Sequence, residues 1–336
     1  MKLHNTINGE ELKEKIKGSD EQRTTISFYK YAKIGNPQLF RDHIFYYWNP
    51  IGVLGRIYVA NEGINAQLSV PSNQLDKYKA ALNDITFLEN VRLNYAVEDD
   101  GKSFFKLAIK VRKKIVADGL NDDLFDVSKP GDYLDVDGFN KLTDDENTVL
   151  IDMRNHYESE VGHFKGAWCP DVDTFREQLP LVVDELAGQK DKKVVMYCTG
   201  GIRCEKASAY LKHKGFKDVY HLEGGIIKYA RDAKANGLEN KFIGKNFVFD
   251  ERLNERITDD VIAECHQCGD AFDDHTNCKN KACNLLFIQC PKCAEKYTGT
   301  CSDDCKAIAA MPEEKQRELR KGKDTGVRIF SKGRFK

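Results

Sequence analysis

Apolar and polar positions follow a regular pattern in the first third of the chain. Some runs have the β-branched and aromatic content of strands, and others repeat their apolar residues at helical spacing. The predicted elements are strands over 25–32, 55–60 and 64–70, helices over 37–48 and 72–85 with Ser72 as the N-cap of the second, and an extended segment over 104–119. This order of strand, helix, strand, strand, helix, strand predicts a ferredoxin-like α+β domain over residues 1–120, with a smaller α+β sandwich as the alternative.

The middle of the chain alternates short apolar runs with helical segments. Residues 121–133 are rich in Asp, Ser, Pro and Gly, which predicts a linker. Three apolar runs follow, over 148–154, 193–198 and 218–225. Such alternation is typical of a parallel sheet covered by helices on both faces, so we predict a central α/β domain over residues 134–235.

Residues 236–336 form a C-terminal extension of different character. An apolar and aromatic stretch over 241–253 predicts packing against the preceding domain. A cysteine-rich region then spans 265–305, and a basic tail follows it. In that tail, residues 315–336 carry nine Lys or Arg against two acidic residues. The whole chain is therefore predicted to be an α/β multidomain protein.

The overall charge is balanced, with 52 basic and 53 acidic residues among 336 and a net charge of -1. A polyanionic partner would therefore be held by local basic patches and not by the field of the whole molecule. No segment approaches the roughly 18 uninterrupted apolar residues of a membrane span, and the N-terminus has no apolar leader. We expect a cytoplasmic protein without membrane contact.

Eight of the 11 cysteines lie in the cysteine-rich region: Cys265, Cys268, Cys278, Cys283, Cys290, Cys293, Cys301 and Cys305. In a chain without an export signal, this density favours metal ligation over disulfides. Eight thiolates are enough for two closed Cys₄ zinc sites, which would be structural because they leave no coordination position open. The spacing leaves the pairing undecided. His266 and His275 are alternative ligands, and reduced thiols without metal are the other interpretation.

The segment VVMYCTGGIRCEKASAYLKHKG, residues 194–215, places Cys198 between an apolar strand and a helix. Small residues after the cysteine let backbone N–H groups turn toward the sulfur, and the helix N-terminus and Arg203 add positive charge, so a nucleophilic thiolate is predicted. The loop is one residue shorter between Cys198 and Arg203 than that of the cysteine phosphatases, which disfavours phosphatase activity. Cys204 is a core residue, a resolving thiol or an auxiliary group.

These residues make the central domain resemble a rhodanese. The segment LIDMRNHYESEVGHFKGA matches the opening motif of that family, and VYHLEGGI matches its closing motif. The resemblance implies that Cys198 is catalytic and carries a persulfide. It implies an active-site loop that includes Thr199, Gly200, Gly201, Ile202 and Cys204. Asp152, Arg154 and His163 are expected to support the loops.

Over nearly its full length, the chain resembles the rhodanese-containing tRNA uridine hydroxylases. The segments that carry this resemblance are ANEGINAQLS, KVRKKIVADGL, YCTGGIRCEKASAYL and CNLLFIQCPKCAEKYTGTCSDDC. The resemblance implies that O₂ supplies an oxygen atom to C5 of the wobble uridine, position 34 of tRNA, giving 5-hydroxyuridine. The sequence contains no flavin or nicotinamide motif and does not identify the electron donor.

Contact with tRNA requires cations beside splayed loop bases. Two candidate patches are basic. The first, in the N-terminal domain, consists of Lys106, Lys110, Arg112, Lys113 and Lys114, and the second is the basic tail. The alternative interpretation of either patch is a solvated charged surface.

Three interpretations of function follow. The first is an O₂-dependent tRNA uridine hydroxylase, and the second is a rhodanese-type sulfurtransferase that passes persulfide sulfur to thiols or tRNA. The third is a zinc-containing RNA-binding or redox-sensing module that is not an enzyme. The intact loop around Cys198 argues against the third, and the basic flanking segments favour the first over the second.

Overall fold

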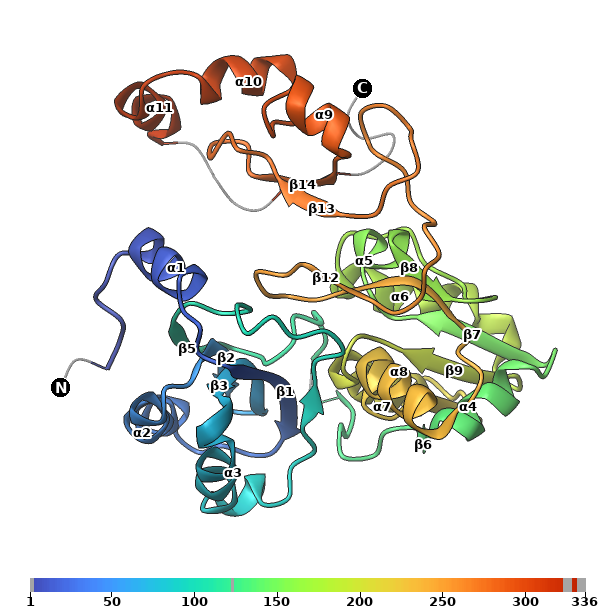
Figure 1. Cartoon of the computed structure of the whole chain (residues 1–336). Coiled ribbons are helices and arrows are strands. Elements are labelled where there is room, and N and C mark those ends of the chain that lie inside the picture. The colour runs from blue at the N-terminus through green and yellow to red at the C-terminus, as the bar shows by residue number, and fades with distance from the viewer. Residues whose placement is uncertain (1–2, 122–123, 323–327, 331–336) are drawn as a thin grey trace.

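The structure is a computed structural model, and it describes residues 3–121, 124–322 and 328–330. Figure 1 shows the N-terminal part in blue beside the central part in green and yellow, with the C-terminal segment in orange and red above them. Four cations of the basic tail lie outside the described residues: Lys323, Lys332, Arg334 and Lys336. Among the described residues, no helix has both the length and the apolar character needed to cross a bilayer.

The N-terminal part is one antiparallel sheet with an added edge strand. Its elements are α1 (Gly9–Lys17), β1 (Arg23–Tyr31), α2 (Pro37–Trp48), β2 (Leu54–Ala60), β3 (Gly63–Pro71), α3 (Leu75–Asn83), β4 (Asn94–Tyr95) and β5 (Leu107–Val111). The strand order is β4-β1-β3-β2-β5. The first four strands pair antiparallel in the ferredoxin-like order. The ferredoxin-like prediction is therefore confirmed.

Helices α2 and α3 cover one face of this sheet and leave the other face open. Trp48 and Tyr78 are completely buried on the covered face, and their rings meet edge to face at 5.2 Å. Alternate residues of the strands, such as Phe28 and Ile57, fill the same core. The remaining alternate positions point to the open face, because side chains alternate along a strand.

Two details of the N-terminal prediction are wrong. The fourth strand is β4, whereas the 104–119 segment supplies only the five residues of β5, parallel to β2 at the opposite edge. The polar pair Asn94–Tyr95 has no strand pattern of its own and is placed by its pairing with β1. In addition, Ser72 is not a helix cap, since it begins a 3₁₀ turn and α3 starts at Leu75 without a side-chain cap.

The central part contains a four-stranded parallel sheet of order β6-β10-β9-β7. Its elements are β6 (Asp132–Leu134), α4 (Val136–Thr143), β7 (Thr148–Asp152), α5 (His156–Glu160), β8 (Gly162–Phe164), α6 (Phe175–Glu185), β9 (Lys193–Tyr197), α7 (Ile202–His213), β10 (Val219–Leu222) and α8 (Gly225–Asn236). Side chains from α6 and α7 fill the core on one face, and those from α4 and α8 fill it on the other. The α/β prediction is confirmed, and the first strand begins at Asp132, inside the segment predicted as a linker.

The C-terminal segment packs on the edge of the central part. Its elements are β11 (Phe242–Phe247), β12 (Asn254–Arg256), β13 (His275–Asn277), β14 (Leu285–Ile288), α9 (Pro291–Lys296), α10 (Asp303–Ala309), α11 (Glu313–Arg320) and β15 (Arg328–Ile329). Strand β11 pairs antiparallel with β8, and Phe242 meets Phe164 edge to face at 5.2 Å. The expected packing of the 241–253 stretch on the central domain is confirmed.

Candidate active site

The loop 198–201 joins the end of β9 to the start of α7, at the carboxyl edge of the parallel sheet. Two backbone bonds fix it to the start of α8: Ile226 N–H donates to the Cys198 carbonyl at 3.0 Å, and Ile227 N–H to the Thr199 carbonyl at 3.2 Å. Gly225 permits this approach, since a Cβ there would lie 2.4 Å from the Cys198 carbonyl oxygen. Gly201 has a φ of 102°, which favours glycine and turns its N–H inward.

The Cys198 sulfur is buried and surrounded by donors. Gly201 N–H donates to Sγ at 3.1 Å. Burial by itself raises the pKa of the Cys198 thiol. The Cys204 thiol, the Arg203 charge and the N–H groups of Cys204 and Gly201 outweigh burial and lower that pKa from 9.0 to about 5. The group is therefore a thiolate at neutral pH.

Cys204 lies in the first turn of α7 and is also fully buried. Burial, the hydrogen bond to Cys198 and the negative charge on Cys198 all raise the pKa of Cys204 well above its usual value. Cys204 therefore stays protonated and donates to the Cys198 thiolate. Its burial in the core fits a core residue, and its contact with Cys198 fits an auxiliary group.

Arg203 is held by a carboxylate to which the sequence analysis gave no role. Its two terminal nitrogens pair with the two oxygens of Glu158 at 2.6 and 2.8 Å, and Nη2 also donates to Thr199 Oγ1 at 3.3 Å. Glu158 is completely buried in α5. Its place in the rhodanese opening motif was visible in the sequence. Its contact with Arg203 was not, because 45 residues separate them.

The predicted support residues fall into two groups. Asp152 and Arg154 form a completely buried ion pair at 2.6 Å, and Arg154 also donates to the Gly162 carbonyl at 2.6 Å. This pair braces the end of β7 beside the loop. His163 is instead directed to the Ser159 carbonyl at 3.1 Å and lines a separate surface depression with Cys169. The structure does not bring His163 to the loop that carries Cys198.

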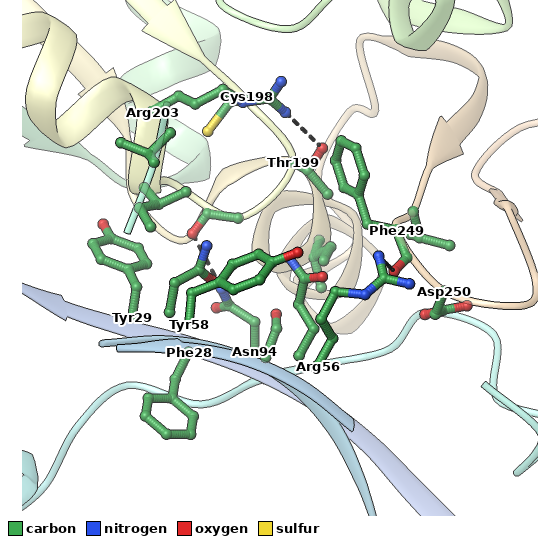
Figure 2. A pocket seen from close by; sticks show the side chains of 18 of the residues that line it. Phe28, Tyr29, Arg56, Tyr58, Asn94, Cys198, Thr199, Arg203, Phe249 and Asp250 are labelled. Atoms are coloured by element: carbon green, nitrogen blue, oxygen red, sulfur yellow. Dashed lines mark hydrogen bonds between the residues drawn. The ribbon is translucent and has the colours of Figure 1, made fainter. Parts of the chain in front are cut away.

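A cavity of about 420 Å³ lies over the loop. Figure 2 shows Cys198, Thr199 and Arg203 on one side of it, strand residues of the N-terminal sheet on the opposite side, and Phe249 and Asp250 at a third side. The size falls within the roughly 300–1,000 Å³ typical of small-molecule sites, and such sites often lie between domains. All three parts of the chain therefore contribute to one cavity.

The opposite wall is the open face of the N-terminal sheet. Cross-strand pairing aligns Ser27, Gln67 and Arg56 in one row and Tyr29, Asn65 and Tyr58 in the next, and all six line the cavity. Hydrogen bonds tie this wall to the loop and to helix α7. Tyr29 donates to Glu205 at 2.8 Å, and Asn94 Nδ2 donates to the Gly200 carbonyl at 3.2 Å.

The predicted basic patch continues from this wall to the edge of the sheet. The four exposed cations lie just before, on or just after β5: Lys106, Lys110, Arg112 and Lys113. The Arg112 guanidinium lies 5.6 Å from the centre of the Tyr58 ring. Lys114 differs from them, because its ammonium pairs with the buried Asp118 carboxylate at 2.6 Å. Lys114 is thus occupied within the fold.

Family models match each of the three parts of the chain. The family models that match are "UPF0176 acylphosphatase like domain" over residues 23–115, "Rhodanese-like domain" over 135–232 and "Rhodanase C-terminal" over 243–306. Proteins named "tRNA uridine(34) hydroxylase" from Pectobacterium carotovorum and Yersinia pestis are 58% identical over 99% of this chain and 94% of theirs. The chain belongs to the tRNA uridine(34) hydroxylase family.

Two solved rhodanese-like structures are each similar to about a third of this family member. The crystal structure of a rhodanese-like domain protein from Staphylococcus aureus is 24% identical, with a TM-score of 0.24, and covers 29% of this chain and 90% of its own. A rhodanese-like domain from Anabaena is 21% identical, with a TM-score of 0.27, and covers 34% of this chain and 80% of its own.

The C-terminal cysteines of this tRNA uridine(34) hydroxylase family member form two groups. In each group the four sulfurs lie within 4.8 Å of one another; the first contains Cys265, Cys268, Cys290 and Cys293, and the second contains Cys278, Cys283, Cys301 and Cys305. Neither His266 nor His275 belongs to either group. Each group contains a pair of sulfurs 3.6 Å apart. Four sulfurs at about 2.3 Å from a tetrahedral zinc are about 3.8 Å apart, so both groups fit this ion.

The first cysteine group is linked to the loop through helix α5. His266, next to Cys265, pairs with Glu160 at the end of α5 at 2.8 Å. The same five-residue helix carries Glu158, which holds Arg203. The cysteine-rich segment therefore packs on the helix that orients the loop arginine.

Proposed function

We propose that this protein hydroxylates uridine 34 of tRNA at C5 with O₂, giving 5-hydroxyuridine. The observation that carries the proposal is the cavity in which a thiolate of lowered pKa faces the polar and aromatic face of a sheet. Such a face is suited to unpaired RNA bases, which proteins stack on aromatic rings and hydrogen-bond at their edges. The relatives that are 58% identical over nearly the full length are named for this substrate.

In the proposed mechanism Cys198 is the nucleophile. Its sulfur lone pair forms a bond to C6 of uracil, and the electron pair of the C5–C6 double bond moves toward O4 as an enolate. Because the residue is 0% exposed, the base has to approach through the cavity, which must widen at the loop. Arg203, held in place by Glu158, helps to keep the sulfur anionic.

The oxidation step then requires one external donor of electrons and protons. The enolate carbon C5 bonds to O₂, and the oxygen retained on C5 becomes the hydroxyl. The other oxygen leaves as water and takes up two electrons and two protons from a thiol-class donor. Loss of the C5 proton expels the Cys198 thiolate and restores the double bond. No residue is assigned as that donor.

The remaining parts have binding and structural roles in this proposal. We infer that the tRNA backbone lies along Lys106, Lys110, Arg112 and Lys113 at the edge of the sheet, where Arg112 lies beside Tyr58 of the cavity wall. The two cysteine groups would each hold a structural zinc, which would fold the segment that supports α5. No chemical step uses these metals, because four protein sulfurs fill each tetrahedron.

The test compares Cys198→Ser with a matched Cys169→Ser control in cells whose own copy is deleted. Cys169 is half-buried and lies outside the cavity. Mass spectrometry of tRNA nucleosides should show 5-hydroxyuridine with the wild type and the control but not with Cys198→Ser. Hydroxyuridine that persists in Cys198→Ser cells would refute the assignment of the nucleophile.

The sulfurtransferase alternative predicts a different product in the same experiment. Its support is the loop geometry alone, and the flanking domains give it no added role. Loss of a thiolated nucleoside, with hydroxyuridine unchanged, would replace the hydroxylase proposal by this alternative.

A further inference from the structure

Among the described residues, three arginines line the cavity, and they differ in how their charge is balanced. Arg203 is paired with both oxygens of Glu158. Arg252 is paired with Asp250 at 2.5 Å and with Glu255 at 2.7 Å. Both guanidiniums are thus engaged in ion pairs with buried carboxylates.

Arg56 is different. Its Nη1 is 3.5 Å from the Phe249 carbonyl oxygen, a long contact with a neutral group. It has no carboxylate partner within 4.0 Å among the described residues. The side chain is exposed and lines the cavity, which places it at the mouth. Figure 2 shows it extending from the sheet toward Phe249 and Asp250. Arg56 therefore keeps a full positive charge at the entrance to the site.

The neighbours of Arg56 on the sheet face add ligand-binding groups. Gln67 is its cross-strand partner, lines the cavity, and has a carboxamide free of hydrogen bonds within the described part of the chain. Tyr58 lies two residues along the same strand and presents a half-buried ring to the cavity. A guanidinium, an amide and a phenol side by side supply a phosphate donor, a base-edge partner and a stacking ring.

We propose that Arg56 binds the backbone phosphate of a single everted nucleotide, whose base lies inside the cavity between Tyr58 and the Cys198 loop. This inference rests on the proposed function and adds to it the way in which the substrate is held. Because Cys198 is 0% exposed, a base that remains stacked in an RNA loop does not reach its sulfur. Enzymes that act on one base commonly flip that nucleotide into a fitted pocket.

The test is a double-mutant cycle between protein and RNA. The full-length protein binds a synthetic anticodon stem-loop with uridine at position 34, with either phosphate flanking that uridine replaced by a neutral methylphosphonate. Arg56→Ala should weaken binding of the unmodified RNA by roughly 10- to 100-fold, as expected for charge-assisted hydrogen bonds. One of the two methylphosphonates should weaken binding by wild type to a similar extent and have almost no effect on Arg56→Ala.

The matched control is Lys77→Ala, which removes an exposed cation from α3, on the other side of the same domain. It should leave both affinity and coupling unchanged. Arg56→Lys keeps the charge and should recover part of the affinity, whereas a general loss of folding would appear in the unfolding transition of both Arg56 variants. The inference would be overturned if the losses of affinity caused by Arg56→Ala and by each methylphosphonate were additive at both positions. Unchanged RNA binding by Arg56→Ala would also overturn it.

This readout is independent of the chemistry. Coupling between Arg56 and one phosphate, together with no hydroxyuridine formed by wild type, would sink the proposed function and leave the phosphate site standing. Hydroxyuridine formation without coupling would overturn the phosphate site and leave the proposed function standing.

Discussion

The buried pair between Glu158 and Arg203 allows a test of how the loop works. The side chains are 0% and 8% exposed and meet through two hydrogen bonds. Removal of one partner leaves the other charge buried without compensation, which typically costs about 3–5 kcal/mol of stability. We therefore expect Glu158→Gln and Arg203→Gln each to destabilise the protein by that amount. The double substitution, which removes both charges and keeps the side-chain sizes, should be more stable than either single variant.

The same pair has a second effect, on the thiol. The decrease of the Cys198 pKa from 9.0 to about 5 favours the thiolate by roughly 5 kcal/mol. The Arg203 charge is one contributor, beside the hydrogen bonds from Cys204 and Gly201. In the double variant that charge is gone and the hydrogen bonds remain. The pKa of Cys198 should therefore rise toward its ordinary value without reaching it.

Two assays separate these effects. Denaturant unfolding gives the stability of the four proteins, and the rate of alkylation by iodoacetamide as a function of pH gives the pKa of the thiol. Alkylation has to be assigned to Cys198 by peptide mass spectrometry, since the chain has 11 cysteines. If the double variant kept the wild-type pKa, the Arg203 charge would not be what activates the sulfur. If iodoacetamide never reached Cys198, the sulfur could not serve as a nucleophile.

Further predictions concern stability, metal and RNA. Between about pH 5 and 9 the unfolded state binds one more proton at Cys198 than the folded state does. The stability of wild type relative to Cys198→Ala should therefore rise by roughly 1.4 kcal/mol per pH unit in denaturant titrations. A stability difference that does not change with pH would contradict the lowered pKa. Elemental analysis should find two zinc ions per chain, and Cys268→Ser and Cys283→Ser should each lose one; loss of both from either variant would contradict two separate sites. Lys113→Glu should weaken tRNA binding, most strongly at low salt, with normal stability, whereas Lys114→Glu should destabilise the fold; equal effects in both assays would remove this distinction.

Local pattern was sufficient for the elements that build the loop. The apolar run before Cys198, the glycines after it and the helix that follows are all encoded within 194–215. The lowered pKa could be predicted for the same reason, because Arg203, Cys204 and Gly201 all lie within six residues of the sulfur. Features produced by neighbours in the sequence were therefore visible without a structure.

Features produced by contacts between residues far apart in the sequence were not visible without a structure. Strand β4 is two residues long and is defined by its pairing with β1, so no local sequence pattern predicts it. Each cysteine group joins two pairs that are distant in the sequence, and the two groups interleave along the chain. Spacing alone therefore allowed several ways to divide the eight cysteines. Lys114 looked like its basic neighbours in the sequence. Only the approach of Asp118 shows that its charge is occupied.

The division between local and distant contacts also separates reactivity from recognition. The groups named as lowering the pKa of Cys198, namely Cys204, Arg203 and Gly201, belong to the rhodanese loop and its helix. By contrast, Arg56, Gln67 and Tyr58 come from a different domain and meet that loop only across the cavity. A rhodanese loop alone would have the reactive sulfur but no wall to select a base. The bond from Asn94 to the Gly200 carbonyl joins the two, because it fixes the recognition wall to the loop that carries the sulfur.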